Sequence, residues 1–497
     1  MNDQETLLGI RRGIEKESLR VLPGGGLALT PHPIALGAAL THPHITTDYS
    51  ESQLELITGV HAGVDAVLGE LTEIHQAVYR ALADERLWVS SMPCGLPADE
   101  TIPIGRYGSS NIGRAKSVYR MGLGQRYGRR MQTISGIHYN WSLPGVGTEG
   151  YFGAIRNFRR EGWLLLYLFG ASPALCDSFV HGREHGLQRL SEHSLYLPHA
   201  TSLRMGNLGY QSDAQASISV SYNCLESYAA SLQAALSRPY APYEAIGVQT
   251  PGGDYNQLST SLLQIENEFY STIRAKRVIR PGERPLHALR ERGVEYIEVR
   301  LMDLDPFEPI GIGADAIRVL DAFLLHCLHS ASPDDTPDEI AANARNQHRV
   351  AARGREPGLM LEHWQGGERS LADWAGDILS GCAAQAELLD AAHGGDAYSA
   401  ALRRVSARLR DPALCPSARV LAAMAQDFGH SHVGFICRQS DAARNALLAL
   451  PFPPALQQRF ERMAADSLAE QARIEAADTL PFEEFRRQYV APERMAV

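Results

Sequence analysis

The stretch Gly-Ile-Glu-Lys-Glu-Ser-Leu (residues 13–19) places two carboxylates in a short segment that is typical of a β-strand. Side chains alternate between the two faces of a strand, so Glu15 and Glu17 share one face. Carboxylates on one face of a sheet repel one another unless a positive charge lies between them. The stretch therefore predicts a strand whose acidic face meets cations.

Three further stretches, residues 45–58, 135–143 and 293–300, set charged groups among apolar and β-branched residues in the same way. With the first stretch they supply six carboxylates, a histidine and an arginine, namely Glu15, Glu17, Asp48, Glu51, Glu55, Glu298, His138 and Arg300. Oxygen ligands of this kind favour Mg²⁺ or Mn²⁺, which usually serve phosphate chemistry. The alternative is a set of unrelated, solvated surface carboxylates. Their apolar neighbours and their recurrence favour a shared metal site in a nucleotide-using enzyme.

The composition of the 497-residue chain is that of an ordinary globular protein, with 44% hydrophobic and 21% charged residues. A net charge of −10, without a strongly basic segment, argues against a nucleic-acid-binding protein. The first 20 residues lack the apolar core of a signal peptide. The longest apolar run, residues 162–176, is too short to span a bilayer and predicts a buried helix. We expect a cytoplasmic protein without membrane contact.

The seven cysteines are scattered, odd in number and never in a Cys-x-x-Cys pair. This pattern favours free thiols in a reducing cytoplasm over a disulfide framework. Cys94 has no identifiable base, so a catalytic thiol is weakly supported. Residues 429–432 (Gly-His-Ser-His) resemble a small metal-binding tract, but they lack acidic or cysteine neighbours and are predicted to form a loop.

The apolar spacing along the chain predicts helices and strands in alternation up to about residue 311. Helices are predicted at 62–83, 111–128 and 150–169. Strands are predicted at 131–143, 263–269 and 294–301, with a hairpin around Pro-Gly-Gly-Asp within 243–262. From residue 312 Ala, Leu and Arg dominate, and we expect mostly helices packed on the sheet.

Several residues have both a functional and an ordinary interpretation. Taken alone, His138 in its alternating strand is more often a satisfied core histidine than a ligand. Arg204 lies among small and polar neighbours, as expected for a guanidinium that binds a substrate carboxylate, although a surface arginine is equally compatible. Arg274, Lys276 and Arg277 could neutralise phosphates or form a solvated charge run.

Four long strings carry a resemblance to a known family: residues 131–140 (MQTISGIHYN), 167–174 (YLFGASPA), 264–270 (QIENEFY) and 293–300 (GVEYIEVR). With them, the sequence resembles the proteobacterial type of glutamate–cysteine ligase nearly from end to end. The region 425–450 departs from the family pattern.

The resemblance implies an α+β, glutamine-synthetase-like fold, in which a curved antiparallel sheet forms a cup with helices outside. It implies a single catalytic unit over 1–497, with the active site in a sheet-bearing part (1–311) and a mainly helical part (312–497) packed on it. The implied reaction is ATP-dependent and Mg²⁺-dependent, with Mn²⁺ as the other candidate ion. It ligates the γ-carboxylate of L-glutamate, through γ-glutamyl phosphate, to the amine of L-cysteine, in the first step of glutathione biosynthesis.

Site residues follow from the resemblance by position. The implied metal ligands are Glu15, Glu17, Asp48, Glu55, His138 and Glu298. The implied substrate-binding residues are Arg204 and Ile134 for glutamate, and Tyr119, Leu123, Gln132, Tyr210 and Tyr270 for cysteine. Arg300, Lys276 and Arg277 are expected to face phosphate, and Glu298, Arg300 and Arg204 to carry catalysis. We expect a monomer without nucleic-acid or membrane partners, and leave feedback by glutathione open.

Other functions are compatible with parts of this pattern. The first is a related γ-glutamyl ligase with a different amine acceptor, which a single change in the acceptor pocket could produce. The second is a two-metal phosphohydrolase, which would need a positioned water and no amine pocket. The third is a catalytically inactive regulatory homologue, which would have no reason to keep mutually repelling carboxylates.

Overall fold

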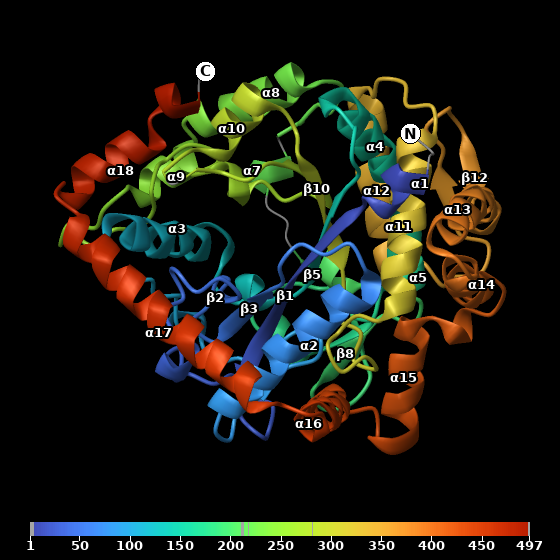
Figure 1. The fold of residues 1–497 in the computed structure, drawn as a ribbon, viewed down its shortest axis with the longest axis horizontal. Coiled ribbons are helices and arrows are strands. Elements are labelled where there is room, and N and C mark those ends of the chain that lie inside the picture. The colour runs from blue at the N-terminus through green and yellow to red at the C-terminus, as the bar shows by residue number, and fades with distance from the viewer. Residues whose placement is uncertain (1–3, 210–212, 217, 281, 496–497) are drawn as a thin grey trace.

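The computed structural model describes residues 4–209, 213–216, 218–280 and 282–495, and its central element is one large antiparallel sheet (Figure 1). The sheet has seven strands, which are β1 (Arg11–Val21), β2 (Ile45–Thr47), β3 (Gln53–Ile57), β4 (Arg86–Leu87), β5 (Ile137–Ser142), β9 (Ile273–Lys276) and β10 (Tyr296–Met302). Their order is β2-β3-β1-β5-β10-β9, and β4 pairs with the end of β1. All of these pairings are antiparallel, which confirms the predicted α+β class.

Helices surround this sheet in Figure 1. Those before residue 312 are α1 (Gln4–Leu8), α2 (Val64–Ala81), α3 (Asn111–Tyr127), α4 (Thr148–Glu161), α5 (Trp163–Phe169), α6 (Asp177–Val180), α7 (Asp213–Ala216), α8 (Leu225–Ser237), α9 (Ala241–Ile246) and α10 (Pro285–Arg292). Those after it are α11 (Ala314–His329), α12 (Pro337–Arg353), α13 (Leu371–His393), α14 (Ala397–Arg410), α15 (Pro416–Asp427), α16 (His432–Ala449), α17 (Pro454–Ala477) and α18 (Phe482–Val490). The predicted helical character of this second part is confirmed, apart from a small hairpin of β11 (Met360–Glu362) and β12 (Glu368–Ser370). The division of the chain at residue 311 stays a prediction. Among the described helices, none is long and apolar enough to cross a membrane.

The two faces of the sheet have opposite chemistry because the side chains of β1 and β5 alternate. One face packs under α2 and α11, where Arg12 forms a 2.7 Å ion pair with Asp321 and Ile14 is fully buried. Tyr139 of β5 donates a 2.7 Å hydrogen bond to the same aspartate. The opposite face carries Glu15 and Glu17, so the predicted acidic face is confirmed.

Lys16 points into the packed face, between the two glutamates in sequence but away from them in space. It is 1% exposed, its Nζ donates a 2.6 Å hydrogen bond to Ser18 Oγ, and no described carboxylate forms an ion pair with it. Burial lowers the pKa of Lys16 to about 7. The folded chain therefore binds fewer protons than the unfolded chain between about pH 7 and the ordinary lysine value near 10.4, and its stability rises with pH in that window.

We expect Lys16→Met to stabilise the protein at pH 7, by up to roughly 5 kcal/mol, because methionine fills the space without a buried charge. The advantage should shrink as the pH approaches 10, because the folded wild-type amine is already neutral there and the unfolded one begins to lose its proton near 10.4. Urea denaturation of both proteins at pH 7 and pH 10 measures this. A stabilisation that is equal at the two pH values would contradict the assignment of a buried, proton-losing amine.

Two predicted elements are shorter than the sequence suggested. The strand expected at 131–143 covers only β5, because residues 131–133 form a 3-10 turn. The helix expected at 150–169 breaks at Gly162 into α4 and α5. The apolar run to residue 176 does not continue as a helix either. Pro173 disfavours helical geometry before it, and the chain leaves α5 to form β6 (Ala174–Cys176), which pairs with β8 (Ser194–Tyr196) and through it with β7 (Gln188–Arg189).

The strands expected around 243–262 and at 263–269 are wrong. The first arm of the expected hairpin is helix α9, and only an isolated bridge between Gln249 and Tyr255 closes the Pro-Gly-Gly-Asp turn. Residues 263–269 form no strand: residues 266–268 are a 3-10 turn, and both of its glutamates are buried in ion pairs. Glu268 contacts Arg126 at 2.9 Å, and Glu266 contacts Arg284 at 2.6 Å.

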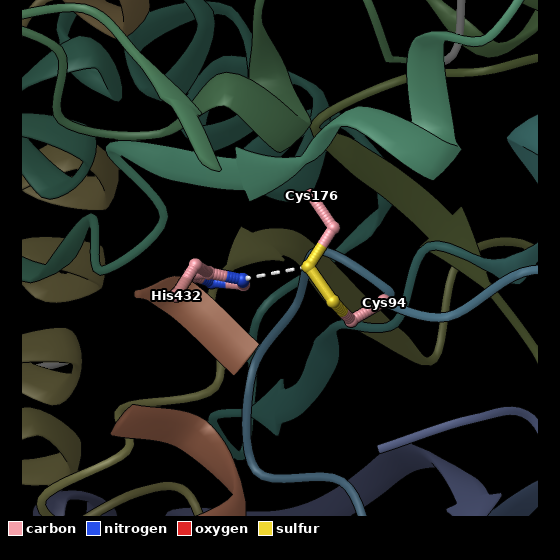
Figure 2. A group of neighbouring side chains, drawn as sticks. All are labelled: Cys94, Cys176 and His432. Atoms are coloured by element: carbon pink, nitrogen blue, oxygen red, sulfur yellow. Dashed lines mark hydrogen bonds between the residues drawn. A yellow bond between two sulfur atoms is a disulfide. The ribbon is translucent and has the colours of Figure 1, made fainter. Parts of the chain in front are cut away.

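The expectation of free thiols is wrong for one pair of cysteines. Cys94 and Cys176 form a disulfide with a Cα–Cα distance of 5.2 Å, across a sequence separation of 82 that gives no local signal. His432 lies beside it, with Nδ1 3.7 Å from Cys176 Sγ (Figure 2). The segment 429–432, expected to be a loop, ends at His432, which is the first residue of α16. His432 does have cysteine neighbours, unlike the expectation for this segment. The free cysteines are Cys224, Cys327, Cys382, Cys415 and Cys437.

Candidate active site

A cleft of about 1250 Å³ opens over the face of the sheet that carries Glu15 and Glu17. Strands β1, β5, β9 and β10 supply side chains to its floor. Helices α3 and α12, with the segments 204–206 and 265–272, contribute to its walls. Polar and apolar groups therefore meet in one large concave space, which is the usual setting of a substrate site.

The four acidic stretches converge on this cleft because their strands are neighbours in the sheet. Glu17 pairs in register with Glu55, and Glu15 pairs with His138. Asp48 follows directly after β2, whose partner is β3. We call the residues that meet there the acidic cluster, and all of them line the cleft: Glu15, Glu17, Asp48, Glu55, His138 and Glu298.

His138 lies in the middle of this cluster. Its Nδ1 is 3.2 Å from Glu15 Oε2 and 3.9 Å from Glu298 Oε1, and its Nε2 is 3.4 Å from Glu17 Oε1. Burial lowers the pKa of His138, and the charge of Arg300 acts in the same direction. A neutral imidazole surrounded by carboxylates is a suitable metal ligand, unlike the satisfied core histidine that its strand alone suggests.

The carboxylates of Glu17, which is buried, and Glu55, which is half-buried, lie close to other negative charges. Burial raises the pKa of Glu17 to about 8, and Asp48 adds to this. Burial raises the pKa of Glu55 well above its usual range, and Glu15 and Asp48 act in the same direction. Such a set stays ionised at neutral pH only with a compensating cation among its members. Its oxygen donors and single imidazole fit Mg²⁺ or Mn²⁺.

Glu298 differs from these carboxylates because two cations hold it. Its side chain is 1% exposed, with Oε1 3.1 Å from Lys276 Nζ and Oε2 3.0 Å from Arg300 Nη1. Burial acts to raise the pKa of Glu298, but Lys276 and Arg300 hold it well below its usual range. Glu298 is therefore an anion that joins the acidic cluster to the basic end of the cleft.

Arg277, the third expected phosphate contact, points away from this basic end. Its Nη1 donates to the carbonyls of Arg292 and Gly293, the latter at 3.0 Å, and it is not among the described residues that line the cleft. Arg274 and Lys276 do line it. Neighbouring residues of a strand face opposite sides, which separates Lys276 from Arg277.

Arg204 is held in the cleft wall, and its Nε has no partner among the described residues there. It is 3% exposed, and its Nη2 donates a 2.8 Å hydrogen bond to the carbonyl of Arg300. Its guanidinium lies against Gly136, where a Cβ atom would overlap with it. Its buried Nε has no hydrogen-bond partner among the described residues. A fixed guanidinium with a free donor is prepared to bind an anion.

The apolar and aromatic side of the cleft holds four of the expected acceptor residues. Tyr119 and Leu123 lie one turn apart on α3, which Ser110 caps by accepting a hydrogen bond from the Gly113 amide. The other two residues are Gln132 and Tyr270, whose side chains are joined by a 2.9 Å hydrogen bond.

Three expected residues are not placed in the wall. Ile134 is completely buried, and it is not among the described residues of the cleft. Tyr210 lies outside the described residues. Glu51, included in the first acidic set, instead accepts backbone hydrogen bonds from His32 at 3.0 Å and Arg106 at 2.8 Å. Glu51 lies in the turn between β2 and β3, where alternation no longer fixes the direction of a side chain.

Sequence reasoning missed some polar residues near the site. Lys116 and Arg120 of α3 line the cleft, and Arg120 donates from Nε to the Asp48 carbonyl. Their spacing of four residues, on the helix that carries Tyr119, was a usable signal. Asn140, two residues after His138 on β5, donates a 2.9 Å hydrogen bond to Glu15 Oε1. Strand alternation could have identified it.

Comparison with known proteins gives consistent matches, by a family profile over most of the chain and by individual relatives over nearly all of it. The family profile described as glutamate–cysteine ligase matches residues 1–350. The glutamate–cysteine ligase of Azotobacter vinelandii is 51% identical and covers 98% of this chain and 96% of that protein. The glutamate–cysteine ligase of Alcanivorax borkumensis is 49% identical, covering 97% of this chain and 96% of its own length.

Solved structures agree with these sequence matches. A glutamate–cysteine ligase from Francisella tularensis in complex with AMP superposes with a TM-score of 0.93 at 35% identity, covering 98% of each chain. A bifunctional glutathione synthetase from Pasteurella multocida is 24% identical with a TM-score of 0.73, over 93% of this chain and 57% of that one, and shares the fold. The chain described here belongs to the glutamate–cysteine ligase family.

Proposed function

We propose that this protein ligates L-glutamate to L-cysteine at the expense of ATP, giving γ-glutamylcysteine, ADP and phosphate in the first step of glutathione biosynthesis. The observation that carries the proposal is the composition of one cleft. It joins the acidic cluster, the basic residues around Glu298, the free donor of Arg204 and a pocket with tyrosines. That the Francisella relative was solved in complex with AMP supports the use of a nucleotide.

The acidic cluster would hold Mg²⁺, or Mn²⁺ in its place. The ligands would be Glu15, Glu17, Asp48, Glu55, His138 and Glu298. Such ions, when bound, offset the negative charge that gathers as a carboxylate approaches the γ-phosphate of ATP. Lys276 and Arg300 would contact the phosphates from the basic end of the cleft, whereas Arg277 would need to leave its two carbonyl partners to do so.

Arg204 would bind a carboxylate of glutamate through its free Nε. The γ-carboxylate, activated as γ-glutamyl phosphate, would then be attacked by the amine of cysteine. Tyr119, Leu123, Gln132 and Tyr270 would surround that second substrate, with Tyr210 as a further candidate. The same proposal includes a cup-shaped, glutamine-synthetase-like fold, a cytoplasmic location and a monomeric state.

Replacing Arg204 should affect one substrate selectively. We expect Arg204→Ala to raise the KM for glutamate by about 100-fold, because a charge-assisted hydrogen bond to a carboxylate is worth roughly 1.5–3 kcal/mol. The KM for ATP should change by less than about threefold. Steady-state kinetics with each substrate varied in turn measures this. Equal increases in both values would mean that Arg204 does not bind glutamate.

The proposed reaction is tested by ADP release from purified protein with ATP, Mg²⁺ and L-glutamate, with and without L-cysteine, and by the mass of the product. Release that depends on cysteine and yields γ-glutamylcysteine supports the proposal. Turnover with another amine only would indicate a related γ-glutamyl ligase. Release without any amine or glutamate would indicate a phosphohydrolase and would contradict it.

A further inference from the structure

Asp303 is a buried carboxylate directly after β10, behind the wall of the cleft. Its side chain is 0% exposed, and it is not among the described residues that line the cleft. Its Oδ2 accepts hydrogen bonds from the Ala171 amide at 2.9 Å and from Ser172 Oγ at 2.6 Å. A carboxylate buried among apolar residues is costly unless it is paired, so these partners indicate a specific role.

The other oxygen of Asp303 faces the turn that carries Arg204. Oδ1 accepts a 3.0 Å hydrogen bond from Ser202 Oγ and lies 3.8 Å from Arg204 Nη1. Ser202 caps the 3-10 turn Leu203–Met205, since its hydroxyl accepts a hydrogen bond from the Met205 amide. Asp303 therefore acts on Arg204 twice, through its charge and through the backbone turn.

A second segment joins this arrangement at Ser172. The Ser172 carbonyl accepts a 2.7 Å hydrogen bond from the Leu203 amide, and its hydroxyl lies 3.3 Å from Ser202 Oγ. The residues on either side of Arg204 are thus tied to the same carboxylate and its partners. The guanidinium keeps its free Nε while its other nitrogens are held, as preorganised binding of an anion requires.

Arg204 also has a competing counter-charge on the cleft side. Its guanidinium lies against Gly136, whose amide donates a 2.7 Å hydrogen bond to Glu17 Oε2 in the acidic cluster. Without the charge of Asp303 behind it, the buried guanidinium would be drawn toward the acidic cluster instead of presenting its donor to a substrate.

We propose that Asp303 is the positioning residue that fixes Arg204 for binding the carboxylate of glutamate. The inference rests on the proposed function, because it takes glutamate as the ligand of Arg204. Asp303 touches neither a substrate nor the reacting atoms, so its effect should appear in glutamate binding and not in the chemical step.

The test is Asp303→Asn, which keeps the shape and removes the charge. We expect the KM for glutamate to rise about tenfold or more, with kcat and the KM for ATP and cysteine changed by less than about threefold. Calorimetric titration with L-glutamate should show the same loss of affinity. The matched control is Asp321→Asn, an equally buried aspartate paired with Arg12 on the opposite face of the sheet. It should lower the melting temperature without changing the KM for glutamate.

The outcomes separate this inference from the proposed function. If the wild-type protein shows neither cysteine-dependent turnover nor glutamate binding, the proposed function and the role of Asp303 are both overturned. If instead the wild type is active while Asp303→Asn keeps its KM for glutamate or loses only kcat, the role of Asp303 is overturned and the proposed function stands. If Asp303→Asn does not fold, the KM of Ser202→Ala for glutamate tests the role of Asp303 instead. This substitution removes one hydrogen bond of the same carboxylate and should raise the KM for glutamate by about threefold, and no change would overturn the proposal.

Discussion

Glu298→Gln should abolish ATP turnover, lowering kcat by about 10³-fold or more, while the protein stays folded. Glutamine keeps the shape of the side chain but removes the charge that lies between Lys276 and Arg300 and beside His138. The change would weaken a cation held by the acidic cluster and release two basic side chains from their place at the phosphate end of the cleft. ADP release at several Mg²⁺ concentrations and a thermal melt measure the two parts of this expectation.

The control for this variant is Glu295→Gln. Glu295 lies just before β10 and its side chain is 46% exposed, outside the described lining of the cleft. Its replacement should leave turnover within about twofold of wild type, as is usual for surface positions. A Glu298→Gln protein that remains active and dependent on Mg²⁺ would contradict the assignment of Glu298 to the metal site.

Gly136→Ala should raise the KM for glutamate by about 100-fold although neither the charge nor the hydrogen-bonding groups of the site change. The added Cβ would occupy the space of the Arg204 guanidinium, which must then move. Gly136 itself cannot easily shift, because its amide donates a 2.7 Å hydrogen bond to Glu17 Oε2 and its carbonyl accepts one of 3.0 Å from the Glu17 amide. The backbone conformation of Gly136 is not left-handed, so alanine adds no backbone strain.

Gly13→Ala is the matched control for Gly136→Ala. Gly13 lies on β1 of the same sheet, and a Cβ there would meet its nearest neighbour, the Gly59 carbonyl, at an ordinary contact distance of 3.5 Å. Its kinetics should resemble those of wild type. Titration of both variants with L-glutamate compares them directly, and equal affinities would mean that Arg204 is not the glutamate-binding group.

Strand alternation was sufficient to predict much of the site. It placed Glu15 with Glu17, and Glu298 with Arg300, on the faces where the structure has them. The same rule, applied to the end of β9, would have excluded Arg277. It fails at Glu51 because a turn has no two-residue period. It fails at residues 263–269 for the same reason, because residues 266–268 form a 3-10 turn whose glutamates are held in ion pairs.

The remaining features depend on contacts between distant segments. His138 alone is compatible with a core position, and only its register opposite Glu15 brings it among the carboxylates. The Cys94–Cys176 disulfide joins residues separated by 82 positions, so no local pattern reports it. Asp303 could not be recognised either, since its partners Ser172 and Ser202 come from other parts of the chain.

The acidic cluster depends on the length of its strands as well as on its residues. Insertion of one amino acid within β1 (Arg11–Val21) would exchange the two faces of that strand. Lys16 would then enter the cleft, and Glu15 and Glu17 would enter the apolar layer under α2 and α11. The loops and outer helices are free of this restriction. In this protein, insertions and deletions in the central strands are therefore more damaging than most substitutions, and a viable variant of different length must differ elsewhere.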